Sequence, residues 1–180
     1  MTIKISAVKN ENEGGCKRPY ALGKRQELSD QRRANILAAA RRLLESEGYP
    51  GLTMETLARE SGVSRQTVHN LFKTKAGVLA ALFDELALSG GMDRMGEVMR
   101  SVMSGTDAEA MLEEYVRVFT GFWSRDRLLL RRIRGIATFD PEFEAALEGR
   151  NQRRRFSAPR VVERLAMLRG SDDAKNVRLA

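Results

Sequence analysis

Apolar residues recur every three or four positions from residue 30 to residue 168, which is the period of an amphipathic helix. Alternating runs of Val, Ile and Thr bounded by turn residues, which predict strands, are nearly absent. The pattern therefore predicts an all-α fold. We expect two short helices between residues 53 and 74, and longer helices at about 30–47, 75–88, 92–103, 107–123, 126–138, 141–156 and 159–169.

Helix boundaries in the second half of the chain carry local signals. Asp140 followed by Pro141 predicts a capped helix start, because proline is well tolerated at the first helical position. Pro159 either starts a further helix or kinks a longer one. The Ser-Asp-Asp run at residues 171–173 resembles one more helix start.

The two short helices between residues 53 and 74 have the features of a helix-turn-helix. Thr53 can cap the first helix, Gly62 permits the backbone of the turn, and Ser64 can cap the second helix. The first helix has an apolar stripe at i, i+3 and i+4, made of Met54, Leu57 and Ala58. The second has a face that can be buried and a polar face that can enter a groove of DNA. The first of these faces holds Val68, Leu71 and Phe72, and the polar face holds Arg65, Gln66, His69 and Asn70.

The segment from about residue 29 to residue 89 resembles the DNA-binding domain of the TetR (tetracycline-repressor-like) family of bacterial regulators. The residues that carry the resemblance are Gly48, Thr53, Leu57-Ala58, Gly62-Val63-Ser64, Thr67, Phe72, Lys75 and Leu79. One position departs from the family pattern, since the family usually has Tyr where this chain has His69. Both side chains can donate a hydrogen bond to a phosphate, so the same role is expected. The resemblance implies a DNA-binding transcription factor, usually a repressor, whose second domain varies with its ligand.

The sequence predicts three parts. Residues 1–28 are polar and include several Asn, Glu and Gly residues, so we expect a disordered leader. Residues 29–89 are the DNA-binding domain, and Gly90-Gly91 breaks the helical pattern after it. Residues 90–180 are a helical domain for effector binding and dimerisation. The last helix is expected to be short, because the sequence stops at Ala180, about two helical turns after the start expected at residues 171–173. In the resembled family two long final helices form a four-helix bundle with a second subunit, so either the last helix is missing here or the interface is built differently.

The formal net charge is +7, and its distribution matters more than its sum. Residues 24–88 hold 10 basic and 8 acidic side chains, so the DNA-binding segment contributes little of the excess. Residues 117–164 hold 12 basic against 6 acidic side chains. This segment is either a solvated arginine-rich helix face or a surface for acidic partners.

Residues suited to catalysis or metal binding are scarce. Cys16 is the only cysteine and His69 the only histidine, which leaves no disulfide framework and no metal site built on cysteine or histidine. No phosphate-binding loop, dinucleotide-binding turn or nucleophile elbow occurs. A signal peptide and a membrane-spanning stretch are also absent. We therefore expect a cytoplasmic protein that is not an enzyme and needs no cofactor or metal.

Seven residues are candidates for contact with DNA. Arg65 can pair bidentately with guanine, and Gln66 and Asn70 can read adenine edges. Short donors and cations near the helix ends are candidates for phosphate contacts, which fix the register of a protein on DNA. These are Thr53, Thr67, His69 and Lys75. The alternative is that the reading-face residues are ordinary exposed polar residues and that the two threonines only cap and pack.

Methionine and aromatic residues are frequent from residue 92 to residue 139, and such a mixture can form an adaptable apolar pocket. The residues expected to line a ligand site between the helices are Met99, Met103, Tyr115, Phe119, Phe122 and Trp123. Arg131, Arg132 and Arg134 could offer a charge to an anionic ligand. The alternatives are an ordinary hydrophobic core and an exposed arginine face.

Together these features favour a ligand-responsive, sequence-specific transcriptional regulator, a repressor that a hydrophobic small molecule releases from a double-stranded DNA operator. A homodimer is expected, because one recognition helix reads only a few base pairs. The apolar seam of the dimer is expected within residues 141–180, from Phe143, Leu147, Val161, Val162, Leu165 and Leu168. The alternative is a helical interaction protein whose arginine-rich second domain binds acidic partners or the nucleic-acid backbone without sequence specificity.

Overall fold

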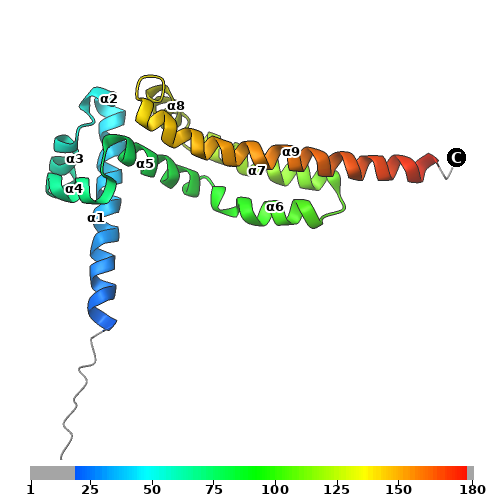
Figure 1. Cartoon of the computed structure of the whole chain (residues 1–180), viewed down its shortest axis with the longest axis horizontal. Helices are drawn as coiled ribbons and strands as arrows, with labels where there is room; N and C mark the ends of the chain where they lie inside the picture. Colours follow the sequence, from blue (N-terminus) through cyan, green and yellow to red (C-terminus); the bar gives the residue numbers. More distant parts are fainter. Residues whose placement is uncertain (1–18, 178–180) are drawn as a thin grey trace, which may run out of the picture.

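The computed structural model describes residues 19–177, which form helices and turns without a strand. The predicted all-α fold is therefore confirmed. The first five helices gather at one end of the molecule, and α6, α7 and α9 extend away from them (Figure 1). In chain order the elements are α1 (Pro19–Ser46), α2 (Gly48–Gly51), α3 (Met54–Ser61), α4 (Arg65–Phe72), α5 (Lys75–Ser89), the 3₁₀ helix η1 (Met92–Arg94), α6 (Met95–Ser104), α7 (Ala108–Arg125), α8 (Arg127–Ile136) and α9 (Pro141–Val177).

The first helix is longer than the sequence predicted. α1 begins at Pro19 rather than near residue 30, so residues 19–28 of the expected disordered leader are helical. Proline fits the first helical turn, because the N–H that it lacks would have no helical acceptor there. A side-chain pair four residues apart supports this exposed part of α1, since Gln26 Nε2 donates to Asp30 Oδ1 at 2.9 Å. The rest of the predicted leader, residues 1–18, lies outside the described residues.

One hydrophobic core joins the helix-turn-helix to helices from the second half of the chain. α1, α3, α4 and α5 contribute most of this first core, and Phe122 of α7, α8 and the first turns of α9 complete it. Its fully buried side chains include Ile36, Leu44, Leu57, Leu79, Phe122, Ile133 and Phe143. A second, smaller core lies between α6, α7 and α9 and contains Val98, Val102, Met111, Val118 and Val161.

Gly90 and Gly91 end α5 as predicted, but the two cores do not divide there. A Cβ on Gly90 would lie 2.6 Å from the Cα of Phe122, so the end of α5 can pack this closely on α7 only with glycine. α8 and the start of α9, which the sequence assigned to the effector domain, instead belong to the first core, where Phe143 and Leu147 are buried. The break in the helical pattern at residue 90 is therefore not a boundary between cores.

α9 is a single helix of 37 residues. Pro159 lies inside it, and residues 171–173 continue it, so the predicted new helix start at those residues and the short final helix are wrong. An internal proline removes one helical hydrogen bond, a cost that packing of the same helix can offset. Such packing is present, because Val161 is buried in the second core two positions beyond Pro159.

Most of the apolar seam predicted for a dimer faces inward. Three of its residues are buried, namely Phe143, Leu147 and Val161. Leu165 and Leu168 pack partly against the second core, and Val162 is exposed. The helical pattern identified the apolar face of α9 correctly, but it could not tell whether a partner subunit or the same chain covers that face.

Two arginine contacts fasten α8 to the end of α1. Arg132 Nη1 donates to the carbonyl oxygens of Leu44 at 2.9 Å and Glu45 at 2.8 Å, which are among the last carbonyls of α1 and have no helical donor. Arg41 of α1 pairs with Asp126, just before α8, at 2.5 Å. Part of the basic excess of residues 117–164 is therefore used inside the fold.

Candidate DNA interface and effector pocket

α3 and α4 form the two helices of a helix-turn-helix, with the caps that the sequence predicted. Thr53 Oγ1 accepts from the backbone N–H of Thr56 at 3.1 Å, and Ser64 Oγ accepts from that of Thr67 at 3.1 Å. Gly62 has a φ of 68°, the left-handed conformation that ends α3 and turns the chain toward α4. The predicted capping and turn roles are confirmed.

The polar face of α4 is exposed, and contacts already order its side chains. Its exposed residues are Arg65, Gln66, His69 and Asn70. Arg65 Nε lies 2.6 Å from Glu55 Oε1 of α3, which leaves the two terminal nitrogens as the fork that can pair with a guanine. Gln66 Nε2 donates to Asn70 Oδ1 at 2.8 Å. The structure therefore brings the three predicted base-reading residues together on one face.

The two threonines predicted to contact phosphates take part in the helix caps. Thr67 Oγ1 lies 2.9 Å from Ser64 Oγ, and Thr53 Oγ1 lies 3.1 Å from Thr56 Oγ1. Thr53 is exposed and Thr67 is half-buried. A hydroxyl can donate once and accept twice, so these contacts leave room for a phosphate. The phosphate contacts themselves stay predictions.

The two lysines at the end of α4 have different surroundings. Lys75 is half-buried, and its Nζ lies 3.6 Å from the centroid of the Tyr49 ring. Lys73 is exposed, and it borders a shallow hollow on α4 together with Arg65 and His69. Sequence reasoning missed Lys73, because the family pattern singles out Lys75 alone in the Lys-Thr-Lys run. The signal available in the sequence was the run itself, which places a second lysine two positions before Lys75.

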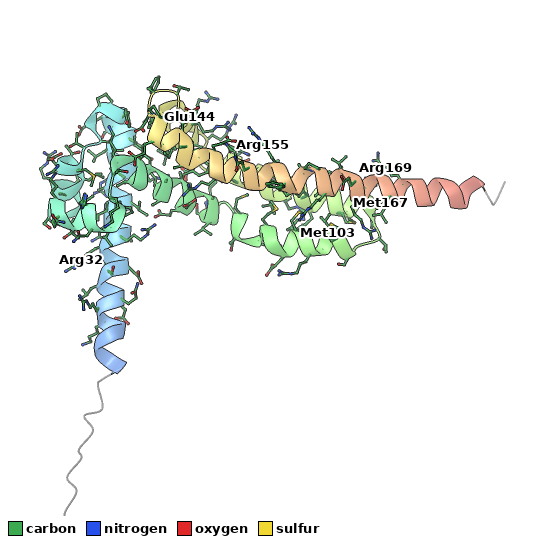
Figure 2. The ribbon with its side chains drawn as sticks, in the orientation of Figure 1. Arg32, Met103, Glu144, Arg155, Met167 and Arg169 are labelled. Atoms are coloured by element: carbon green, nitrogen blue, oxygen red, sulfur yellow. The ribbon has the colours of Figure 1, made fainter. Side chains whose placement is uncertain are left out.

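The six predicted pocket residues are divided among three hollows. A pocket of about 570 Å³ between α5, α6, α7 and α9 is lined by Met99, Phe119 and Phe122. Tyr115, Phe119 and Trp123 border a hollow of about 450 Å³ along α7 and the start of α8. Met103 lies instead in a groove of about 930 Å³ between α6 and α9, where Met167 lies across from it (Figure 2). The structure therefore places half of the predicted set at one pocket.

The 570 Å³ pocket combines apolar walls with one charged pair. Arg150 Nε donates to Asp84 Oδ1 at 2.6 Å, and Arg150 Nη2 donates to Asp84 Oδ2. These hydrogen bonds raise the pKa of Arg150 above its ordinary value, so the guanidinium stays charged. Such a pocket suits an apolar body that a few polar groups orient. Sequence reasoning could not identify the pair, because its members lie 66 positions apart.

Among residues 19–177, no group of His, Cys, Asp and Glu side chains is placed to hold a metal ion. No helix in that range combines the length and the apolar character that crossing a membrane requires.

A capped helix, a turn through a left-handed glycine and a second helix with an exposed polar face define a helix-turn-helix DNA-binding domain. The comparison with protein families agrees, since the model of bacterial regulatory proteins of the tetR family matches residues 36–82. The chain therefore belongs to the TetR family through this domain, as the sequence resemblance predicted.

Similar curated proteins carry related names. The chain is 29% identical over 126 residues to the HTH-type transcriptional regulator EthR of Mycolicibacterium smegmatis, a match that covers 69% of this chain and 56% of that protein. It is 30% identical over 125 residues to the HTH-type transcriptional regulator AlkX of Mycobacterium tuberculosis, with coverages of 68% and 54%. EthR of Mycobacterium tuberculosis is 31% identical over 90 residues, with coverages of 50% and 41%. The chain thus spans about half the length of these relatives.

Proposed function

We propose that the protein is a sequence-specific transcriptional repressor that binds a double-stranded DNA operator in the cytoplasm. The observation that carries the proposal is the exposed polar face of α4 on a capped helix-turn-helix of the TetR family. Arg65, Gln66 and Asn70 read base edges in the major groove. Phosphate contacts come from Thr53, Thr67, His69 and Lys75.

The effector is a hydrophobic small molecule that binds in the pocket between α5, α6, α7 and α9. The volume of about 570 Å³ falls in the range of ligand pockets, roughly 300–1,000 Å³. Met99, Phe119 and Phe122 supply apolar wall, and the Arg150–Asp84 pair supplies a polar end. Binding of the effector changes the relative position of two reading heads and releases the DNA.

A two-fold dimer carries the two reading heads. The exposed side of α9 that borders the groove with α6 is the proposed dimer surface, because Phe156 and Met167 are 71% and 67% exposed there. These residues lie eleven positions apart, about three helical turns, so they share one side of the helix. Arg160 and Glu163 lie between them on the same side of α9, so the proposed surface combines apolar and charged side chains.

The arginines of the second half of the chain support a structural use of the basic excess rather than a surface for acidic partners. Four of them donate to backbone carbonyls elsewhere in the fold, namely Arg125, Arg132, Arg150 and Arg164. The guanidinium of Arg134 lies 5.1 Å from the centroid of the Trp123 ring. Part of the arginine-rich surface expected for an interaction protein is thus used within the fold.

A binding-site selection from random-sequence duplexes tests the proposed function. We expect enrichment of one palindromic sequence, and no enrichment would contradict sequence-specific binding. The Trp123 ring lies 4.7 Å from that of Phe122, so its fluorescence should report compounds that enter the pocket. Such compounds should also release the selected duplex. A compound that fills the pocket and leaves the DNA bound would contradict ligand control.

A further inference from the structure

The start of α9 contacts the DNA-binding domain at the point where α5 begins. Asp140 lies just before α9, Glu142 lies in its first turn, and they meet residues that are 91 and 68 positions away in the sequence. Their partners are Tyr49 of α2 and Thr74, the N-cap of α5. The proposed phosphate contact, Lys75, is the first residue of α5 and follows Thr74 directly.

Lys75 lies against the aromatic ring of Tyr49, and Tyr49 is hydrogen-bonded to Asp140. The Lys75 Nζ lies 3.6 Å from the centroid of the Tyr49 ring, and the Tyr49 hydroxyl donates to Asp140 Oδ2 at 2.5 Å. A hydroxyl that donates to a carboxylate makes its ring richer in electrons, which strengthens the attraction of the ring for a cation. Asp140 therefore acts on Lys75 through Tyr49.

The protonation states of Tyr49 and Asp140 favour this hydrogen bond. Burial, and then the hydrogen bond to Asp140, raises the pKa of Tyr49 to about 12. The same hydrogen bond, together with the nearby charge of Lys75, lowers the pKa of Asp140. At neutral pH the donor is thus a neutral phenol and the acceptor a carboxylate.

Asp140 is anchored to α9 and moves with it. Its second oxygen, Oδ1, accepts from the backbone N–H of Phe143 at 3.0 Å and caps the helix. Phe143 is fully buried in the first core. Glu142 Oε1 adds a second contact, because it accepts from the Thr74 hydroxyl at 2.7 Å. The start of α9 thus contacts the N-cap of α5 directly and reaches Lys75, the first residue of α5, through Tyr49.

The same helix lines the effector pocket. Arg150 and Ser157 of α9 lie at the 570 Å³ pocket, so a molecule that displaces α9 there also displaces Asp140. We propose that Asp140 is a positioning residue, which orients Lys75 for its DNA contact by acting through Tyr49. The link from Asp140 through Tyr49 to Lys75 then couples ligand binding in the pocket to DNA binding. The inference rests on the proposed function, in which Lys75 binds a phosphate.

Variants of the full chain test the inference, with a duplex selected by the wild type from a random-sequence pool as the probe. The test variants are Asp140→Asn, Tyr49→Phe and Lys75→Ala. Asparagine is as good an N-cap as aspartate, so Asp140→Asn removes the charge and keeps the cap. Glu144→Gln is the matched control, because Glu144 is exposed one turn further along α9 and its replacement removes the same charge (Figure 2).

We expect Asp140→Asn and Tyr49→Phe each to weaken duplex binding by up to about two- to fivefold, because both keep an aromatic ring under Lys75 and change only the hydrogen bond that positions it, so the full cation–π contact sets the upper bound. In a Lys75→Ala background, neither change should weaken binding further. Removal of a negative charge near DNA by itself favours binding, so a loss of affinity cannot come from charge alone. Glu144→Gln should bind at least as tightly as the wild type.

Two outcomes separate a failure of the inference from a failure of the proposed function. If Lys75→Ala weakens binding but Asp140→Asn binds as tightly as the wild type or more tightly, the inference is overturned and the DNA contact stands. Losses that add in the double variant would overturn the inference in the same way. If the pool yields no preferred duplex, or if Lys75→Ala binds like the wild type, the proposed DNA contact itself is wrong.

Discussion

At the scale of single residues, the reading face of α4 depends on contacts that its own polar side chains make. The Arg65 and Glu55 side chains are 70% and 63% exposed, so their ion pair adds at most about 1 kcal/mol to stability. Its consequence for binding is larger, because a guanidinium that is already ordered loses less conformational freedom when it meets a base. Gln66 and Asn70 are ordered in the same way by their mutual hydrogen bond.

Arg65→Ala should weaken binding to the selected duplex by about 1–3 kcal/mol and relax the preference at one base position in each half-site. The reason is the loss of a base-edge contact. Lys73→Ala, on the same exposed surface, should instead weaken all sequences alike. A repeated binding-site selection measures both effects. An unchanged sequence preference for Arg65→Ala would show that Arg65 does not read a base.

Tyr49 should give the fold a dependence on high pH. Burial raises the pKa of Tyr49 from 10.0 to about 12, so the folded state favours the neutral phenol. The stability that this adds is fully present below pH 10 and is lost as the pH rises through about 12. Between pH 10 and about pH 12, thermal unfolding should therefore show that Tyr49→Phe loses less stability than the wild type does. Equal losses in the two proteins would contradict this burial.

At the scale of helices, the sequence predicted those features that local chemistry decides. Thr53, Ser64 and Asp140 cap their helices through hydrogen bonds to residues three positions away, a relation that the sequence shows directly. The start of α1 and the continuity of α9 were missed. Pro159 is a local signal for a break, and it is overridden by the burial of Val161, which depends on distant helices.

Two glycine variants should shift stability in opposite directions. Gly90→Ala should destabilise the fold by about 1–3 kcal/mol, because its Cβ would press on the Phe122 backbone. Gly149→Ala should stabilise it by about 0.5–1 kcal/mol, because Gly149 lies within α9 with open space at its Cβ. Denaturant unfolding measures both changes. A stabilising effect of Gly90→Ala would contradict the close approach of α5 and α7.

At the scale of the whole molecule, α9 links the parts that the sequence treated as separate domains. Its start belongs to the first core with the helix-turn-helix, its middle lines the proposed effector pocket, and it then packs in the second core. The sequence predicted apolar faces but not their neighbours. On α7, for example, Phe119 and Phe122 reach the pocket, whereas Tyr115 and Trp123 border a hollow elsewhere. Only the packing of other helices decides this division.

The proposed dimer surface on α9 can be tested by mass. Light scattering should give about twice the chain mass of 20.2 kDa for the wild type. Phe156→Glu should return the mass toward that of one chain, because it replaces an apolar side chain of the proposed dimer surface with a charged one. Leu128→Glu is the control, since Leu128 is 73% exposed but lies on α8. If Leu128→Glu dissociates the protein and Phe156→Glu does not, the dimer surface lies elsewhere.

Sequence-specific DNA binding is the central claim, and an equilibrium titration at physiological salt tests it most directly. The selected duplex and a scrambled duplex of the same composition are titrated side by side, and both titrations are repeated as the salt concentration rises. We expect the selected duplex to bind at least ~10³ times more tightly at physiological salt. A ratio near one, with both affinities falling together as salt rises, would mean that the protein binds only the phosphate backbone.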